Sequence, residues 1–92
     1  MTARLVVPSA LRTASGGLRE VEVSGATLRD VLDDLASRLP VLERRIRDEQ
    51  GSLRPHVLVF VDGVMCRTGE LDVPVGEDSE VHVAPAVSGG AG

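Results

Sequence analysis

One helical segment stands between two groups of strand-like segments, and this order limits the folds open to the chain. The helix is expected to begin at Thr27, whose hydroxyl can accept a first-turn N–H, with Asp30 three positions later in a capping-box-like arrangement. The apolar residues that follow recur at helical spacing: Leu28, Val31, Leu32, Leu35, Ala36 and Leu39. The segment therefore has one stripe to bury and one solvated face.

The residues before this helix predict two strands. Residues 3–8 are rich in Val and Leu and end at a proline, and residues 18–24 alternate, with Val21 and Val23 on one side. Between them, Ser15-Gly16-Gly17 marks a turn. The pattern predicts an opening hairpin.

The residues directly after the helix are compatible with two ways of ending it. Pro40 either stops the helix or opens a second short one. In the second case we expect three apolar residues to pack, namely Val41, Leu42 and Ile46. We expect the charged residues Glu43, Arg44, Arg45 and Arg47 to face solvent.

Three more strands are predicted in the second half. The apolar run at residues 56–61 suits a central strand, Asp62-Gly63 suits a two-residue turn, and residues 64–67 suit its partner strand. Residues 68–79 are expected to be irregular, with Leu71 and Val75 as buried anchors. Residues 80–84 alternate and form the last strand, which places His56 and His82 on strands.

The order strand, strand, helix, strand, short strand, strand predicts an α+β fold of the β-grasp (ubiquitin-like) type, a mixed sheet packed on one main helix. Because a long crossover links the two groups, a parallel central pair flanked by antiparallel hairpins is possible. A ferredoxin-like fold is the rival, but it needs a second helix where Gly69, Pro74 and Gly76 stand. Residues 1–87 are expected to form the domain, and residues 88–92 a flexible tail.

Composition excludes several functions for this 92-residue chain. A net charge of -4 opposes nucleic-acid binding, and Phe60 is the sole aromatic residue, too little for base stacking. No apolar run is long enough to span a bilayer. Cys66 is the single cysteine, so no metal site is expected, and it is interpreted as a small structural hydrophobe. We expect a cytoplasmic protein without a membrane or nucleic-acid partner.

Several segments of the chain match the pattern of a known family. They are residues 25–28 with Val31 and Leu35, the strand at 57–61 followed by Asp62-Gly63, and residues 81–90, which end in Pro85-Ala86-Val87-Ser88-Gly89-Gly90. With these segments, which span nearly the whole chain, the protein resembles the MoaD/ThiS family of ubiquitin-like sulfur-carrier proteins. It is most similar to the CysO-like branch in Leu11-Arg12 before Gly16-Gly17, in Gly51-Ser52-Leu53-Arg54 and in residues 85–90.

The resemblance implies a cosubstrate and not an enzyme. A ubiquitin-activating-enzyme-like adenylyltransferase would use Mg-ATP to adenylate the carboxylate of Gly90, and a sulfur donor would convert the adenylate to a thiocarboxylate. Ser88 and Gly89 complete the tail, because residues with little or no side chain can thread a narrow channel. The carrier itself would hold no cofactor and no catalytic residue. A sulfur-acceptor synthase would receive the sulfur, for cysteine or another metabolite.

The same sequence is compatible with two other functions. A ubiquitin-like modifier would join its terminus to lysines of target proteins, and a plain binding module would leave the tail idle. The chain has no lysine of its own, which fits a reactive acyl terminus but equally fits a GC-rich genome.

Partner docking is expected on the sheet. If Val57, Val59 and Val61 face the helix, then Leu58 and Phe60 point to the uncovered face, unless long loops fold over them. Pro85 and Val87, beside the tail, are expected to contact the same partner.

The sequence departs from the family after Gly90, where Ala91-Gly92 follows the usual final pair. We expect a peptidase, of the JAMM metallopeptidase type, to remove these two residues before activation.

Overall fold

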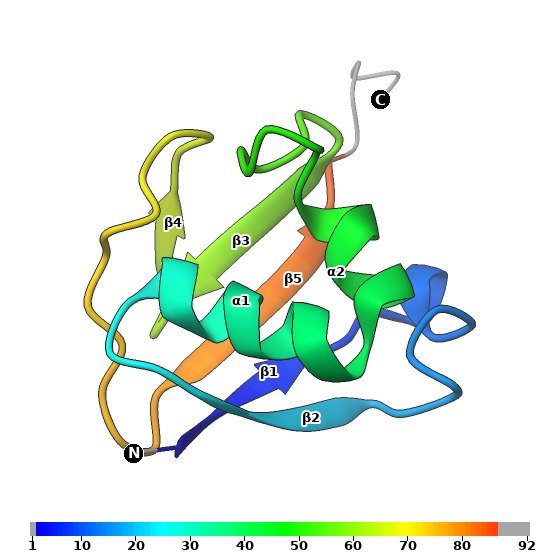
Figure 1. Ribbon diagram of the computed structural model, residues 1–92, viewed down its shortest axis with the longest axis horizontal. Helices are drawn as coiled ribbons and strands as arrows, with labels where there is room; N and C mark the ends of the chain where they lie inside the picture. The colour runs from blue at the N-terminus through cyan, green and yellow to red at the C-terminus, as the bar shows by residue number, and fades with distance from the viewer. Residues whose placement is uncertain (1, 87–92) are drawn as a thin grey trace.

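A five-stranded sheet forms one layer of the protein and two helices on one face of the sheet form the other (Figure 1). The computed structural model describes residues 2–86. The strands are β1 (Thr2–Val6), β2 (Glu20–Ser24), β3 (Val57–Val61), β4 (Val64–Cys66) and β5 (Glu80–Pro85). The helices are η1 (Ser9–Leu11), a short 3-10 helix, α1 (Leu28–Arg38) and α2 (Pro40–Ile46).

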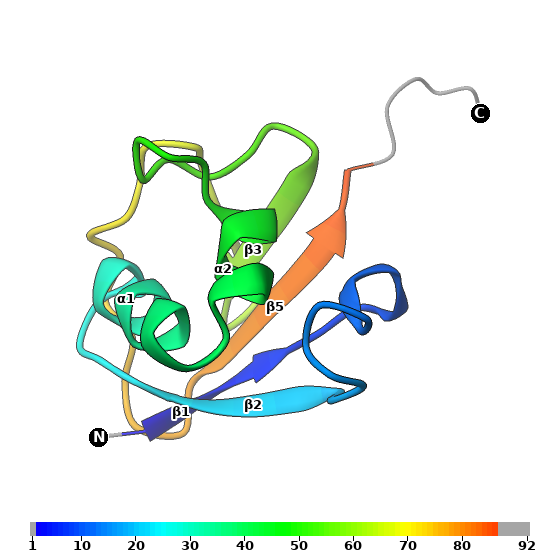
Figure 2. The same ribbon diagram turned by 45° about the vertical axis from the view of Figure 1, so that its right-hand side comes forward.

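The strand order is β2-β1-β5-β3-β4, with β1 and β5 parallel and every other pair antiparallel. This confirms the predicted β-grasp arrangement with a parallel central pair. Residues 67–79 form no helix, so the ferredoxin-like alternative is wrong. Figure 2 shows α1 and α2 on the same side of the sheet.

The core lies between the helices and the sheet. Its fully buried side chains come from both layers and include Leu5, Val23, Leu28, Leu32, Leu35, Leu42, Ile46, Val59 and Val81. Leu71 and Val75 are also buried, which confirms their predicted role as anchors of an irregular segment.

The connection between β1 and β2 is longer than predicted. The two strands pair antiparallel, which confirms the predicted hairpin, but residues 7–19 join them through η1 and a loop, whereas residues 9–17 were expected to do so. Gly16 and Gly17 do turn the chain, at φ 71° and 91°, in the left-handed region that favours glycine. Ser15 is buried in this loop, where its hydroxyl donates to the carbonyls of Arg12 and Leu18. The loop thus has hydrogen bonds of its own, which a two-residue turn cannot provide.

The start of α1 matches its sequence signals. The Thr27 hydroxyl accepts from the Asp30 N–H at 3.2 Å, and the Asp30 carboxylate accepts from the Ala26 N–H at 3.4 Å. Gly25 precedes this cap at φ 153°, and a Cβ there would lie 2.5 Å from the Cβ of Asp30. The chain therefore needs glycine to approach the first turn so closely.

The second short helix forms, but two predictions about its faces are wrong. Leu42 and Ile46 are fully buried as expected, whereas Val41 is 58% exposed. Glu43 and Arg47 are buried instead of solvated, and the Arg47 Nε donates to the Glu43 carboxylate at 2.7 Å. Arg47 also reaches Asp33 on α1 at 2.9 Å. Glu43 and Arg47 lie on the flank of α2 that faces α1, so α1 and not solvent covers these two side chains.

The turn between β3 and β4 is the predicted two-residue turn. Asp62 and Gly63 have φ values of 49° and 86°, as a hairpin turn of the I′ type requires. The Asp62 carboxylate accepts from the Glu80 N–H at 2.9 Å and from the Ser79 hydroxyl at 2.8 Å. These two hydrogen bonds lower the pKa of Asp62 and tie the turn to the start of β5.

Candidate functional site

The C-terminal segment leaves the fold from a central strand. β5 pairs with β1 on one side and with β3 on the other, and Pro85 lies opposite Val57. Beyond the strand, the Ala86 N–H donates to the carbonyl of His56 at 2.9 Å. The predicted docking residue Val87 and the predicted tail, residues 88–92, lie outside the described residues, so their roles stay predictions.

Leu58 and Phe60 lie half-buried on the sheet face opposite the helices. Val57, Val59 and Val61 are buried against the helices, as the alternation predicted. The strand register sets Phe60 between Met65 of β4 and His82 of β5, and it sets Leu58 beside Ala84. These apolar residues define an outer patch: Leu58, Phe60, Met65 and Ala84. Met65 is 53% exposed, so the patch is open to contact, although a docking role remains a prediction.

The other half of this sheet face is charged. Arg4 lies 3.4 Å from the Glu80 carboxylate and 3.9 Å from that of Glu20. The Nε2 of His82 lies 2.6 Å from Glu80, so His82, on its strand as predicted, is part of this charged group. The outer patch therefore has a polar rim on one side, a common arrangement at protein interfaces.

The two remaining candidate side chains have different environments. Cys66 is buried, and burial raises the pKa of its thiol, which disfavours the reactive thiolate. This confirms the structural interpretation of Cys66. His56 lies in an exposed turn just before β3, so its predicted place on a strand is wrong.

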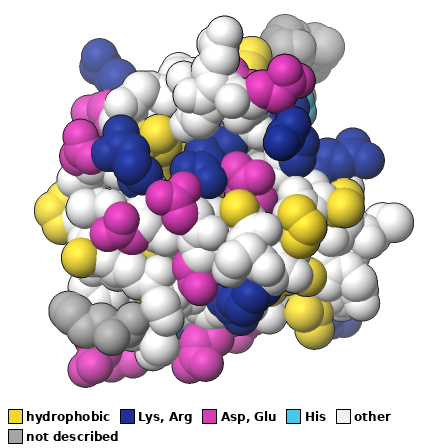
Figure 3. Space-filling view, viewed as in Figure 1, with side chains coloured by type: hydrophobic (Ala, Val, Ile, Leu, Met, Phe, Trp, Pro, Cys, Tyr) yellow, Lys and Arg dark blue, Asp and Glu magenta, His cyan; other side chains and the backbone are white. Residues whose placement is uncertain are grey.

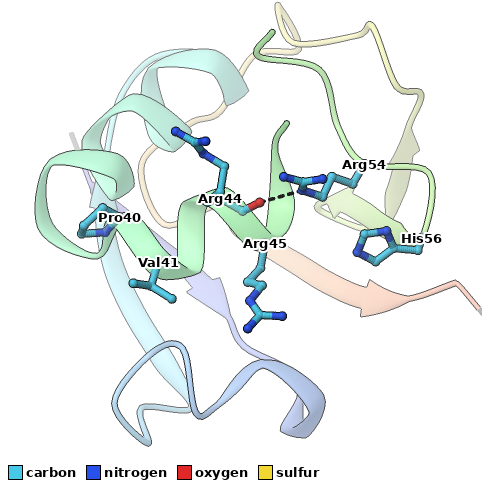
Figure 4. Close-up of a pocket in the computed structure, with 6 residues that line it drawn as sticks. All are labelled: Pro40, Val41, Arg44, Arg45, Arg54 and His56. Atoms are coloured by element: carbon cyan, nitrogen blue, oxygen red, sulfur yellow. Dashed lines mark hydrogen bonds between the residues drawn. The ribbon is translucent and has the colours of Figure 1, made fainter. Parts of the chain in front are cut away.

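The sequence analysis missed a basic cavity next to the base of the tail. It has a volume of about 540 Å³ and is lined by Pro40, Val41, Arg44, Arg45, Arg54 and His56 (Figure 4). The Arg54 Nε donates to the carbonyl of Arg44 at 2.7 Å, which links the segment before β3 to α2. The adjacent basic residues at 44 and 45 were a signal in the sequence, but their proximity to Arg54 and His56 depends on the tertiary fold.

The part of the chain that the structure covers has neither a metal-binding cluster nor a membrane-spanning helix. Within residues 2–86, no cluster of three or more His, Cys, Asp or Glu side chains could hold a metal ion. No helix in the same range has the length and apolar character needed to cross a bilayer.

Comparison with known proteins agrees with this geometry. The model of the ThiS family matches residues 5–90, which includes every strand from β2 to β5, both α-helices and most of the tail. The chain belongs to the ThiS family. Its membership agrees with the resemblance found in the sequence and with the β-grasp fold.

Similar proteins include both sulfur carriers and protein modifiers. The sulfur carrier protein CysO of Mycobacterium tuberculosis is 31% identical over 98% of this chain and 100% of its own length. The small archaeal modifier protein 1 of Haloferax volcanii is 37% identical over 76% of this chain and 78% of its own. Among solved structures, a chain of the Amycolatopsis orientalis BexX/CysO complex superposes with a TM-score of 0.84 at 32% identity, over 96% of this chain and 99% of that one.

Proposed function

We propose that this protein is a sulfur carrier whose C-terminal glycine is charged by a separate activating enzyme. The observation that carries the proposal is membership of the ThiS family together with near full-length similarity to CysO sulfur carriers. The fold supports it, because the last strand is central and leads into the tail that holds Gly89-Gly90.

The chemistry requires no catalytic side chain on the carrier. Hydrolysis of the Gly90–Ala91 peptide bond first frees the Gly90 carboxylate. This carboxylate attacks the α-phosphate of Mg-ATP, pyrophosphate leaves, and an acyl adenylate forms. A sulfur donor then attacks the acyl carbon and AMP leaves, which gives a thiocarboxylate after sulfur transfer is complete. The reaction needs ATP and reduced sulfur, so we place it in the cytoplasm. A sulfur-acceptor synthase, for cysteine or another metabolite, would consume the product.

The proposal is tested by the intact mass of the chain truncated at Gly90, after incubation with its cognate activating enzyme, ATP and a sulfur source. We expect exchange of one oxygen for one sulfur. A control without ATP should leave the mass unchanged. If no exchange occurs under conditions that charge related carriers, the sulfur-carrier function is wrong.

The similarity to small archaeal modifier protein 1 favours a second function, conjugation to lysines of target proteins. Both functions use the same activated tail, so denaturing gels of cell extract probed for this chain are needed to separate them. A ladder of heavier conjugates would favour the modifier, and a single free band would favour the carrier. Because this chain has no lysine, none of the heavier bands could be a chain linked to the side chain of a second copy.

We propose that the activating enzyme docks on the outer patch and also contacts Pro85 and Val87. The known CysO from Amycolatopsis orientalis was crystallised in complex with BexX, so a relative of this chain forms a stable complex with a protein partner. In this chain the outer patch offers half-buried apolar side chains next to a charged rim.

Replacing Phe60 with Asp, or Leu58 with Asp, is expected to weaken binding to the activating enzyme by about 30-fold, because apolar anchors inside a polar rim carry most interface energy. Titration calorimetry would measure the affinity. Val64→Asp is the matched control, since Val64 is 67% exposed on β4 but pairs with Val61 on the other sheet face. If Phe60→Asp or Leu58→Asp unfolds the domain, as judged by circular dichroism, that residue belongs to the core and its docking role is wrong.

A further inference from the structure

The basic cavity brings together three arginines that have no carboxylate partner in the described structure. The chain has ten arginines. Within residues 2–86, Arg4, Arg29, Arg38 and Arg47 form ion pairs, whereas Arg44, Arg45 and Arg54 have no carboxylate within 4 Å. Figure 3 shows cationic side chains over the α2 side of the helix face. An acidic chain thus leaves three cations free on one surface.

The position of the cavity is as informative as its charge. His56 lines the cavity, and its carbonyl accepts from the N–H of Ala86, two residues before the tail. Any protein that takes the tail into a channel must come close to this point. A surface of that protein would therefore lie against the cavity while the tail is bound.

We infer that the cavity docks an acidic surface of the activating enzyme, with carboxylates that pair with Arg44, Arg45 and Arg54. This inference rests on the proposed function and adds a second contact, distinct from the outer patch on the opposite face of the sheet. Unlike charges at this contact speed association and fix the orientation of the carrier. Val41, 58% exposed beside these arginines, supplies apolar area at the same surface.

The geometry favours an acidic protein over other anions. Figure 4 shows the side chains of Arg44 and Arg45 pointing in opposite directions from α2, so a single phosphate-sized anion cannot contact both guanidinium groups. Several carboxylates spread over a protein surface can. Nucleic acid is less suited, because the chain has a net charge of -4 and no aromatic side chain lines the cavity for base stacking.

The test is the affinity of the full chain for its cognate activating enzyme, with Arg44→Glu/Arg45→Glu as the variant. The matched control is Arg19→Glu/Arg29→Glu, which changes the net charge equally at two exposed arginines outside both the cavity lining and the outer patch. Substitution of Arg44 keeps the backbone carbonyl that accepts from Arg54. A neutral variant, Arg44→Gln/Arg45→Gln, covers the case in which charge reversal weakens α2.

We expect the charge-reversal variant to bind about tenfold or more weakly, mainly through slower association, and the control to stay within about threefold of the native chain. The difference should shrink between about 0.05 M and about 0.5 M salt, since screening weakens exposed charge pairs. The neutral variant should fall between the native chain and the charge-reversal variant.

Equal binding by the variant and its control would overturn the inference. So would micromolar binding of a single-stranded oligonucleotide that is lost in the variant while enzyme binding is unchanged. Failure of the proposed function has a different signature: the chain truncated at Gly90, with its arginines unchanged, would acquire no thiocarboxylate at saturating enzyme. If this truncated chain is charged but the cavity variant binds as its control does, only the acidic contact is wrong.

Discussion

Truncation of the chain at Gly90 is expected to raise its rate of thiocarboxylate formation by about 100-fold or more over the full chain when no peptidase is present. Two extra residues add about 7 Å to an extended tail. A channel shaped for a final Gly-Gly would therefore hold the Gly92 carboxylate beyond the α-phosphate of ATP. The family match ends at residue 90, which leaves Ala91-Gly92 outside the matched segment.

This prediction is tested with the two chains side by side in one assay, with purified activating enzyme, ATP and a sulfur source, and intact mass as the readout. A chain ending at Ser88 is the negative control, since it keeps the fold but lacks both glycines. Equal charging of the full and truncated chains would end the processing hypothesis and move the acyl site to Gly92. Rescue of the full chain by a JAMM-type metallopeptidase would instead support removal of Ala91-Gly92.

Replacing Arg47 with Met is expected to lower the free energy of unfolding by about 3 kcal/mol, because the Glu43 carboxylate would remain buried without its cation. The side chains of Arg47 and Glu43 are 9% and 11% exposed, so water cannot fully replace the lost partner. The same change removes the contact of Arg47 with Asp33, which is one of the links between α2 and α1.

Urea unfolding followed by circular dichroism would measure this effect, since the chain has no Trp or Tyr for fluorescence. The double variant Glu43→Leu/Arg47→Met should recover most of the loss, because it removes both buried charges. Arg45→Met is the control, expected to stay within about 0.5 kcal/mol of the native chain. A loss below about 1 kcal/mol in Arg47→Met would show that solvent reaches Glu43 after the substitution.

Local patterns predicted most of the fold. The Thr27 cap, the single stripe on α1 and the Asp62-Gly63 turn are each decided by residues within a few positions of one another. The length of the first connection was harder to predict. Gly16 and Gly17 indicate that the chain turns, but η1 and the buried Ser15 show that the turn belongs to a longer loop.

The faces of α2 could not be predicted because a short helix has two equivalent flanks. Leu42 and Ile46 define its buried stripe, and Val41 lies about 100° to one side while Glu43 lies about 100° to the other. Which flank is covered depends on where α1 lies, and that is a tertiary fact. The i, i+4 spacing of Glu43 and Arg47 was the one available signal for a pair.

For the candidate site too, local patterns predicted some residues and tertiary contacts decided the others. Alternation along residues 57–61 was sufficient to place Leu58 and Phe60 on the face without helices. Met65 joined them only through the register of β4, and the basic cavity only through the contact between the Arg54 side chain and the Arg44 carbonyl. Contacts between distant segments carry no local signature in the sequence.

The central place of β5 has a mechanical consequence. A protein that draws the tail into a channel pulls along the axis of β5, whose hydrogen bonds to β1 and β3 run across that direction. Such a load shears the bonds on both edges together, whereas a strand peeled sideways from the rim of a sheet would lose them one by one. A load applied along β5 is therefore resisted by both neighbouring strands at once, so we expect the domain to keep its shape when its tail is pulled.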